Sequence, residues 1–300
     1  MTAPKLAALV MAGGLGTRMR SAVPKHLHPL LGRRMVDWVV EAARPLGLER
    51  LVVVASPDTA AAFEGVEVAV QERPLGTGDA ARSARAALDA VGDEVLVLSG
   101  DTPLLTSELL QSVLEAHRAS GAGATVLSFF PDDLRSYGRI LRDGEGRLRA
   151  IVEAADATEA ELAVLEANTS IYVFDAPLLW PALERLEPAN SQGELYLTDV
   201  VRDLVAGGRE VAVHVAPDRT SPGSSTGLSF PSTRVPTSTS RGAQGSSSHA
   251  TSDGNAPVRT IGAGPGAGSK PTTVTPPAPT ARRTATGRPS AARSRTRSPS

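Results

Sequence analysis

Short apolar runs alternate with amphipathic helical patterns over residues 1–218. The runs have the length of buried strands, and the patterns between them have the length of helices. The predicted strands are Leu6–Met11, Leu51–Ala55, Glu67–Val70, Val95–Leu98, Ala124–Phe129, Thr169–Phe174 and Val211–Val215. The predicted helices run near Met35–Leu46, Gly78–Ala90, Ser107–Ala119, Pro177–Leu186 and Tyr196–Ala206. Such alternation predicts an α/β fold on a mostly parallel sheet.

Two further runs are predicted to leave this pattern. Gly138–Leu141 and Leu148–Val152 are joined by Asp-Gly-Glu-Gly at residues 143–146. A glycine-rich link of this length between two short apolar runs is typical of a β-hairpin. We therefore expect a hairpin arm in addition to the parallel sheet.

The first predicted strand runs directly into glycines, then Arg18 and Lys25. The glycines are Gly13, Gly14 and Gly16. Bare backbone lets several N–H groups approach an anion, and the two basic side chains add positive charge, so the loop could cradle phosphate. The alternative is an ordinary strand-to-helix turn. No Lys-Ser or Lys-Thr pair follows, which excludes a P-loop, and Met19 replaces the third glycine of a dinucleotide fingerprint.

Residues 24–30 read Pro-Lys-His-Leu-His-Pro-Leu and are followed by Gly32 and Met35. This stretch resembles the signature of the sugar-nucleotide pyrophosphorylases, and within them the bifunctional N-acetylglucosamine-1-phosphate uridyltransferases/glucosamine-1-phosphate acetyltransferases. The resemblance implies a Rossmann-like nucleotidyltransferase sheet. It also implies nucleotide binding at Met11, Ala12, Gly13 and Gly14, where the family usually has Leu-Ala-Ala-Gly.

A second glycine-containing loop, residues 71–78, follows the third predicted strand. The Gln71 carboxamide offers a donor and an acceptor, and both are required to hydrogen-bond the polar edge of uracil. Gly76 would let the backbone approach the base. Any capped loop could look similar. The resemblance assigns Gln71, Gly76 and Thr77 to uridine recognition.

The strand Val95–Leu98 leads into Ser99, Gly100 and Asp101. A carboxylate just past a buried strand can cap the next helix, or it can bind Mg²⁺ together with water and phosphate oxygens. The resemblance favours the magnesium ligand for Asp101, with Ser99 and Gly100 beside the substrate.

Three separate positions match the sugar-binding half of the same family. They are Gly138, Glu153 and Asn168. Their carboxylate and amide groups could hydrogen-bond sugar hydroxyls and an N-acetyl group. Residues 192–199 also resemble the family segment that closes the sugar pocket.

The resemblance implies that N-acetylglucosamine 1-phosphate attacks UTP, releasing pyrophosphate and forming UDP-N-acetylglucosamine for cell-wall precursor synthesis. The nucleophile is already an anion, so no general base is needed. Catalysis would rest on positioning and on neutralisation of charge by Mg²⁺, Arg18 and Lys25.

Composition limits the other possibilities. The chain has no cysteine, which excludes disulfides and thiolate chemistry, and its five histidines lack the spacing of a metal motif. No membrane-spanning run or secretory signal is present, so a cytoplasmic protein without membrane contact is expected.

Residues 219–300 have a different character, being rich in Ser, Thr, Pro, Gly and Arg. They contain 11 basic residues and one acid, whereas residues 1–218 hold 20 basic and 31 acidic residues. Such a tail is predicted to be disordered. Its composition also fits a GC-rich gene translated out of frame, and the alternative is a native basic tail that touches nucleic acid without specificity.

The resemblance ends near Asp218. The family's second metal ligand, an asparagine in Gly-Val-Asn or Gly-Ile-Asn, has no match, because the only later asparagine is Asn255 in another context. The hexapeptides of the family's trimerising β-helix acetyltransferase domain are missing too. We therefore expect impaired turnover and a monomer or weak oligomer. A non-catalytic sugar-nucleotide-binding module, or another sugar-1-phosphate nucleotidyltransferase, remains the alternative.

Overall fold

The computed structural model describes residues 3–14, 21, 23–134 and 136–217. Gly16 and Arg18, the boundary at Asp218 and the tail 219–300 lie outside the described residues, so the expectations for them remain predictions. In chain order, the strands are β1 (Leu6–Ala12), β2 (Pro29–Leu30), β3 (Arg33–Arg34), β4 (Arg50–Ala55), β5 (Glu67–Val70), β6 (Glu94–Ser99), β7 (Ala124–Phe129), β8 (Arg139–Arg142), β9 (Leu148–Val152), β10 (Ala167–Asp175) and β11 (Val211–Val215). The α-helices are α1 (Met35–Ala43), α2 (Thr77–Ser83), α3 (Arg85–Leu88), α4 (Ser107–Ser120), α5 (Glu159–Leu162), α6 (Ala176–Glu184) and α7 (Leu197–Ala206), with 3-10 turns at Lys25–Leu27, Arg44–Leu46 and Ala60–Ala62.

The central sheet has the strand order β11-β7-β10-β6-β1-β4-β5. The pairs β1 with β4, β1 with β6, β4 with β5 and β11 with β7 are parallel, which confirms the predicted largely parallel α/β sheet. The strand β10 is the exception, because it runs antiparallel to both β6 and β7. The chain reaches β10 from β7 through the hairpin arm rather than through the helical crossover that usually joins parallel neighbours.

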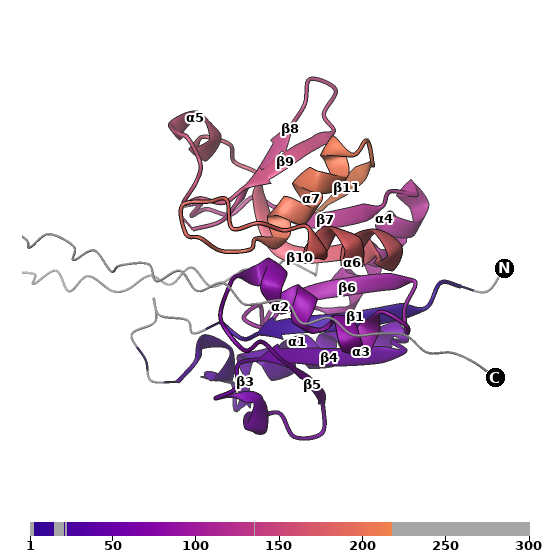
Figure 1. Cartoon of the computed structure of the whole chain (residues 1–300), viewed down its shortest axis with the longest axis vertical. Helices are drawn as coiled ribbons and strands as arrows, with labels where there is room; N and C mark the ends of the chain where they lie inside the picture. Colours follow the sequence, from indigo (N-terminus) through magenta and orange to yellow (C-terminus); the bar gives the residue numbers. More distant parts are fainter. Residues whose placement is uncertain (1–2, 15–20, 22, 135, 218–300) are drawn as a thin grey trace, which may run out of the picture. The chain divides into compact units, whose positions relative to one another are not determined.

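Helices cover both faces of this sheet (Figure 1). Side chains of β1 alternate between two apolar clusters, with Leu9 packing in the cluster that contains residues of α2, α6 and α7, and Val10 in the cluster that contains residues of α1 and α4. Because β1 is buried on both sides, it is apolar throughout rather than alternating. The strand therefore runs through the core and ends at the carboxyl edge of the sheet.

Two predicted helices are interrupted. The helix predicted for Met35–Leu46 ends as an α-helix at Ala43 and continues as a 3-10 turn, because Pro45 has no N–H for an i to i−4 bond. The helix predicted for Gly78–Ala90 divides at Ala84, whose N–H bonds the carbonyl of Ala81 three residues back. These differences shorten both helices without moving them.

The predicted hairpin arm is confirmed by the antiparallel pair β8 and β9. The Arg142 guanidinium donates to both carboxylate oxygens of Glu166, at 2.8 and 2.7 Å, and Ser128 Oγ donates to Oε1 at 2.6 Å. Burial alone would raise the pKa of Glu166, but Arg142 and Ser128 more than offset that effect and hold the pKa below its usual value. The ion pair ties the arm to the residue before β10, and the Ser128 hydrogen bond ties that residue to β7.

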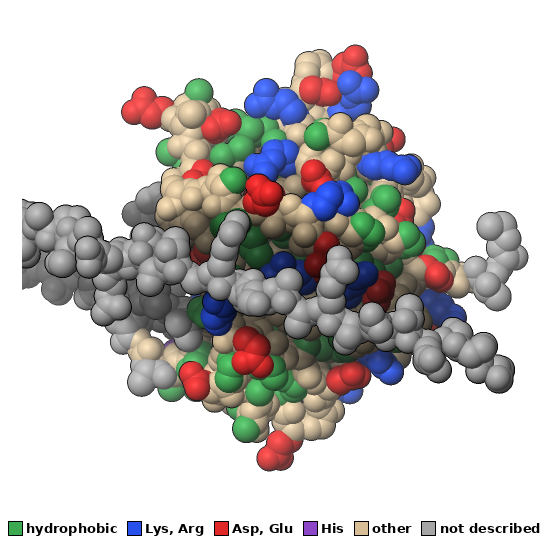
Figure 2. Space-filling view, viewed as in Figure 1, with side chains coloured by type: hydrophobic (Ala, Val, Ile, Leu, Met, Phe, Trp, Pro, Cys, Tyr) green, Lys and Arg blue, Asp and Glu red, His purple; other side chains and the backbone are tan. Residues whose placement is uncertain are grey.

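Acidic and basic side chains are interspersed on the face seen in Figure 2. Arg85 pairs with Glu184 at 3.0 Å, and Arg185 pairs with Asp203 at 2.6 Å, so ion pairs link α3 to α6 and the end of α6 to α7. Exposed pairs of this kind contribute little each to stability. Among the described residues, no helix has the length and apolar character needed to cross a membrane.

Candidate functional site

The carboxyl ends of β1 and β6 pack closely together. The N–H of Gly100 donates to the carbonyl of Met11 at 2.9 Å, and a Cβ at Gly100 would lie only 2.8 Å from that oxygen. Ala12 and Gly13 are buried at this junction, and Gly14 is exposed. The predicted residues of the two strand ends therefore share one edge of the sheet, where ligands of α/β proteins bind.

The loop after β5 reaches the same edge. A Cβ at Gly13 would lie 2.5 Å from Gln71 Oε1, so a larger residue there would have to displace the Gln71 side chain. The Gln71 side chain is 4% exposed, and its Nε2 donates to the carbonyl of Gly76 at 3.1 Å and to Asp79 Oδ2 at 2.9 Å. Gln71 thus lies against Gly13 and bonds Gly76, and Asp79 joins them as a residue that the sequence analysis did not single out.

Residues 75–78 are fastened to the segment before α7. Leu195 N donates to Leu75 O at 2.7 Å, Gly78 N donates to Leu195 O at 2.7 Å, and Leu197 N donates to Thr77 Oγ1 at 3.0 Å. Gly76 has a φ of 111°, and a Cβ there would lie 2.5 Å from Leu195 O, so this position requires glycine for both conformation and space. Residues 75–78 and the segment before α7 are therefore joined into one structural unit.

Lys25 and Asp101 form an ion pair at this edge. Lys25 Nζ lies 2.7 Å from Asp101 Oδ2, and Ser99 Oγ donates to Asp101 Oδ1 at 2.6 Å. The side chains of Lys25 and Asp101 are 38% and 32% exposed, so both reach solvent. Burial alone would raise the pKa of Asp101, but the Lys25 ammonium and the Ser99 hydroxyl more than offset it, and the carboxyl pKa lies below its usual value.

Asp101 fits only one kind of metal site. The described residues contain no group of three or more His, Cys, Asp or Glu side chains that could hold a metal ion. Mg²⁺ needs fewer protein ligands than that, since it often binds through one or two carboxylates, with water and phosphate oxygens as the remaining ligands. The ionised, half-exposed Asp101 carboxylate suits an ion that arrives with a phosphate ligand.

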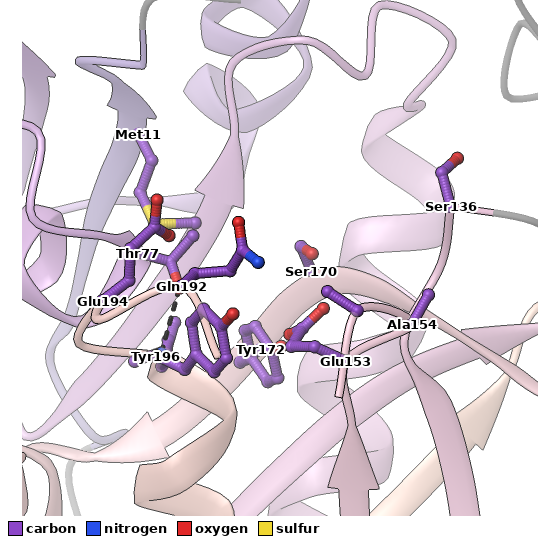
Figure 3. A pocket seen from close by; sticks show the side chains of 12 residues that line it. Met11, Thr77, Ser136, Glu153, Ala154, Ser170, Tyr172, Gln192, Glu194 and Tyr196 are labelled. Carbon is purple, nitrogen blue, oxygen red and sulfur yellow. Dashed lines mark hydrogen bonds between the residues drawn. The ribbon is translucent and has the colours of Figure 1, made fainter. Parts of the chain in front are cut away.

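A pocket of about 510 Å³ lies beside this edge. Its lining includes the predicted residues Met11, Thr77 and Glu153. The sequence analysis assigned no individual role to the others, which are Ser136, Ala154, Ala155, Ser170, Tyr172, Gln192, Glu194, Tyr196 and Leu197. Figure 3 shows Met11, Thr77 and Glu194 toward one end and Ser136 and Ala154 toward the other. The volume is in the range of small-molecule sites.

Glu153 is the half-buried acid of this pocket. Its Oε1 accepts a hydrogen bond from Thr198 Oγ1 at 3.1 Å, and a Cβ at Gly138 would lie 3.3 Å from its Oε2. Burial raises the pKa of Glu153, and the Thr198 hydroxyl only partly offsets this. Gly138 and Glu153 therefore lie together, and their contact with a sugar stays a prediction.

Asn168 stands behind the pocket rather than in its lining. It is 3% exposed, its Nδ2 donates to the Tyr172 hydroxyl at 2.7 Å, and its Oδ1 accepts from Ser170 N at 3.0 Å. The pairing of β10 with β7 shifts register between Asn168 and Tyr172, and Ser170 has a φ of 62°. Asn168 thus shapes the bulge that brings Ser170 and Tyr172 to the pocket, and its own contact with a sugar stays a prediction.

The segment before α7 is organised by Asn190. Asn190 Oδ1 accepts from Gln192 N at 3.2 Å and from Glu194 N at 3.1 Å, and Nδ2 donates to Glu194 O at 2.5 Å. The resemblance of residues 192–199 to a pocket-closing segment was the sequence signal for this region. The sequence contained no comparable signal for Tyr172 or Ser170, because their positions depend on an irregular strand.

The chain is similar to a known protein family and to individual members of it. Residues 8–201 match the family described as MobA-like NTP transferase domain. The protein named Bifunctional protein GlmU from Exiguobacterium sp. is 44% identical over 214 residues, covering 70% of this chain and 48% of that protein. The one from Leifsonia xyli subsp. xyli is 46% identical over 219 residues, covering 70% of this chain and 45% of its own length.

The chain therefore spans about half the length of the curated relatives it matches. Among solved structures, a UDP-glucose pyrophosphorylase complexed with UDP-glucose matches with a TM-score of 0.59 and 16% identity, covering 70% of this chain and 90% of that one. At that identity the match supports the fold alone.

Proposed function

This chain belongs to the family of MobA-like NTP transferase domains, and we propose that it transfers a uridylyl group from UTP to N-acetylglucosamine 1-phosphate. The matches to Bifunctional protein GlmU confirm the resemblance indicated by residues 24–35. The choice of UTP and of the acetamido sugar rests on that resemblance and on the side chains around the pocket. We name Gly13, Lys25, Gln71, Gly76 and Asp101 the nucleotide end, and Gly138, Glu153, Asn168, Tyr172 and Thr198 the sugar end.

The observation that carries the proposal is the Lys25–Asp101 pair at the carboxyl edge of the sheet. A lysine ammonium beside a glycine-ended strand can neutralise phosphate charge, and a half-exposed carboxylate beside it can hold a divalent ion. The transfer of a nucleotidyl group needs both of these functions at one place.

In the proposed reaction a phosphate oxygen of the sugar phosphate forms a bond to the α-phosphorus of UTP. The bond from that phosphorus to the bridging oxygen of the β-phosphate breaks, and pyrophosphate leaves with the electron pair. Lys25 would offset the negative charge on the phosphates, and Gln71 would orient the base. Since the attacking oxygen is already ionised, the chain's task is to hold two anions in line.

Mg²⁺, when bound, would neutralise phosphate charge and stabilise the leaving pyrophosphate. Asp101 is the described residue that would hold it, with Ser99 orienting the carboxylate. Arg18, in the phosphate loop, would add a further positive charge.

At the sugar end, Glu153 would accept a hydrogen bond from a sugar hydroxyl or the N-acetyl N–H. Thr198 holds one carboxylate oxygen, and the other lies beside Gly138, where a side chain would crowd it. Asn168 would act by holding Tyr172 and Ser170 at the pocket or by contacting the sugar itself.

We also propose that residues 1–218 form the catalytic domain, that residues 219–300 form a disordered tail, and that the protein acts in the cytoplasm as a monomer or weak oligomer. Within residues 219–300 no Gly-Val-Asn or Gly-Ile-Asn occurs, so Asp101 would bear the protein's share of metal ligation. Turnover would then be slower than in a chain with a second ligand.

Calorimetry and turnover measured together test this proposal. UTP and UDP-N-acetylglucosamine should bind with heats that depend on Mg²⁺, and pyrophosphate release should require N-acetylglucosamine 1-phosphate. Binding without pyrophosphate release would indicate a non-catalytic sugar-nucleotide-binding module. Faster release with another sugar 1-phosphate, such as glucose 1-phosphate, would indicate a different nucleotidyltransferase.

A further inference from the structure

We propose that Asp79 is a positioning residue that fixes the Gln71 carboxamide with its oxygen toward the base, so that the site selects bases carrying an imide N–H. The inference rests on the proposed function and names a determinant of base selection outside the predicted site residues. Asp79 lies in the first turn of α2 and is 8% exposed.

The first step concerns the hydrogens of Gln71 Nε2. A carboxamide has two N–H donors, and here one donates to Gly76 O at 3.1 Å and the other to Asp79 Oδ2 at 2.9 Å. Both partners are obligate acceptors. A flipped carboxamide would place Oε1 against two oxygens, so Asp79 and Gly76 together permit one orientation.

The second step concerns the groups left over. Gln71 Oε1 accepts no hydrogen bond from the described residues. Two described side-chain atoms, His26 Nε2 and Trp180 Nε1, lack a partner and are inaccessible to solvent, and Gln71 Oε1 is not among them. The Gly76 N–H also makes no hydrogen bond in the described part of the chain. Within the described part of the chain, an acceptor on Gln71 and a donor on Gly76, two residues already joined by a hydrogen bond, are therefore left without partners.

This pair matches one kind of base edge. The N3–H of uracil or thymine donates, and the carbonyl next to it accepts, which complements Gln71 Oε1 and the Gly76 N–H. Cytosine has an unprotonated N3 beside an amino group, the opposite pattern. With the carboxamide held in this orientation, cytosine would be disfavoured, because its N3 would face Gln71 Oε1 and its amino group would face the Gly76 N–H.

The third step is what holds Asp79. Arg82 Nη2 pairs with Asp79 Oδ1 at 2.7 Å, while Oδ2 accepts from Gln71. An aspartate can satisfy both donors because each of its oxygens accepts. An asparagine has one oxygen, and the charged guanidinium would compete for it, turning the amide N–H₂ toward Gln71. Gly76 O alone would then favour the original carboxamide orientation, and both orientations would become accessible.

The test compares binding of UTP and CTP, by calorimetry on the full chain with Mg²⁺, in the unmodified protein and in Asp79→Asn. The unmodified protein should favour UTP by roughly 10- to 100-fold. Asp79→Asn should reduce that preference to within a few-fold, mainly by improving CTP binding. Gln71→Ala should also lose the preference, through weaker UTP binding.

Arg82→Gln is the matched control, because it removes the same ion pair but keeps the carboxylate that faces Gln71. It should keep the UTP preference. If Asp79→Asn retains the preference, or weakens both nucleotides equally, Asp79 has only a structural role and the inference is wrong.

A probe of the unmodified protein covers the case in which Asp79→Asn does not fold. The triphosphate of 3-methyluridine lacks the N3–H and should bind as poorly as CTP. If it binds as well as UTP, the carboxamide oxygen does not read this edge and the inference is overturned. If the unmodified protein binds UTP no better than CTP, the proposed uridine specificity itself fails.

Discussion

At the nucleotide end, key polar groups are half-exposed or lack a partner among the described residues, whereas at the sugar end most polar groups are hydrogen-bonded to one another. Gln71 Oε1 has no partner among the described residues, and the Lys25–Asp101 pair is half-exposed. At the sugar end, Asn168 uses its amide on Tyr172 and Ser170, and Glu153 accepts from Thr198.

The contrast separates two ways of building a site. Groups that await a ligand contribute little to folding, so their replacement should change function and leave stability nearly unchanged. Groups that hold one another in the interior contribute to both, because a buried donor or acceptor left alone costs free energy. Variants at the two ends should therefore differ in kind.

The largest functional effect is expected for Lys25→Ala at the nucleotide end. Loss of a positive charge at the phosphates should lower kcat by about 100- to 1,000-fold. The free energy of unfolding should change by less than about 0.5 kcal/mol, since the side chain is 38% exposed. Pyrophosphate release and urea denaturation measure the two. Unchanged turnover would remove Lys25 from the reaction.

Asp101→Asn keeps the shape of the side chain and can still accept from Ser99, but it removes the carboxylate charge. We expect turnover to fall by about 10- to 100-fold, with a higher Mg²⁺ concentration needed for half-maximal activity. A titration with Mg²⁺ at saturating UTP gives this value. Ser99→Ala is the control for the orienting hydroxyl and should shift the titration less. The assignment would be wrong if Asp101→Asn left the Mg²⁺ requirement where it was.

Asn168→Ala tests the sugar end, where we expect a loss of stability. The substitution leaves the Tyr172 hydroxyl and the Ser170 N–H without their partner, at a cost of about 1–3 kcal/mol. Urea denaturation of the single variants and of the double variant with Tyr172→Phe would measure the coupling. If the two changes are additive, the hydrogen bond between these side chains does not support the pocket.

The smallest effect is expected for Glu153→Gln, and its sign is opposite. Because burial raises the folded-state pKa of Glu153, the folded protein binds this proton more tightly than the unfolded chain does. The stability linked to protonation is present at acidic pH and is lost as pH rises through the folded pKa. The neutral glutamine should thus stabilise the fold at pH 7.5 by on the order of 1 kcal/mol, or roughly 2–4 °C in Tm.

That gain should shrink as pH falls through the raised pKa of Glu153, where the unmodified carboxyl takes up its proton, and thermal denaturation at pH 7.5 and at acidic pH tests it. Use of the sugar phosphate should weaken at the same time, as a higher KM. If the variant is less stable than the unmodified protein at pH 7.5, the ionised Glu153 carboxylate does not destabilise the fold and the prediction is wrong.

The same contrast explains what the sequence could predict. Gly13, Gln71 and Asp101 each follow a regular apolar run, and once the runs are recognised as parallel strands their carboxyl ends must share an edge. Strands β5, β7 and β11 have the predicted bounds. Pro45 lies inside the helix predicted for Met35–Leu46 and accounts for the earlier end of α1.

The sugar end could be predicted only by resemblance. The register shift in β10 and the positive φ of Ser170 place Tyr172 and Ser170 at the pocket, and no periodic pattern encodes such an irregularity. The contact between Asp79 and Gln71 likewise depends on how the loop after β5 turns back on α2. Interactions of this kind become visible only when the backbone is known.

The most direct test of uridylyl transfer follows the phosphorus atoms themselves. The full chain would be incubated with UTP, N-acetylglucosamine 1-phosphate and Mg²⁺, and the products followed by ³¹P NMR, with Lys25→Ala as the control. We predict equal amounts of UDP-N-acetylglucosamine and pyrophosphate, with neither formed when the sugar phosphate is omitted. Unchanged substrates, or phosphate released from UTP without a sugar nucleotide, would contradict the account.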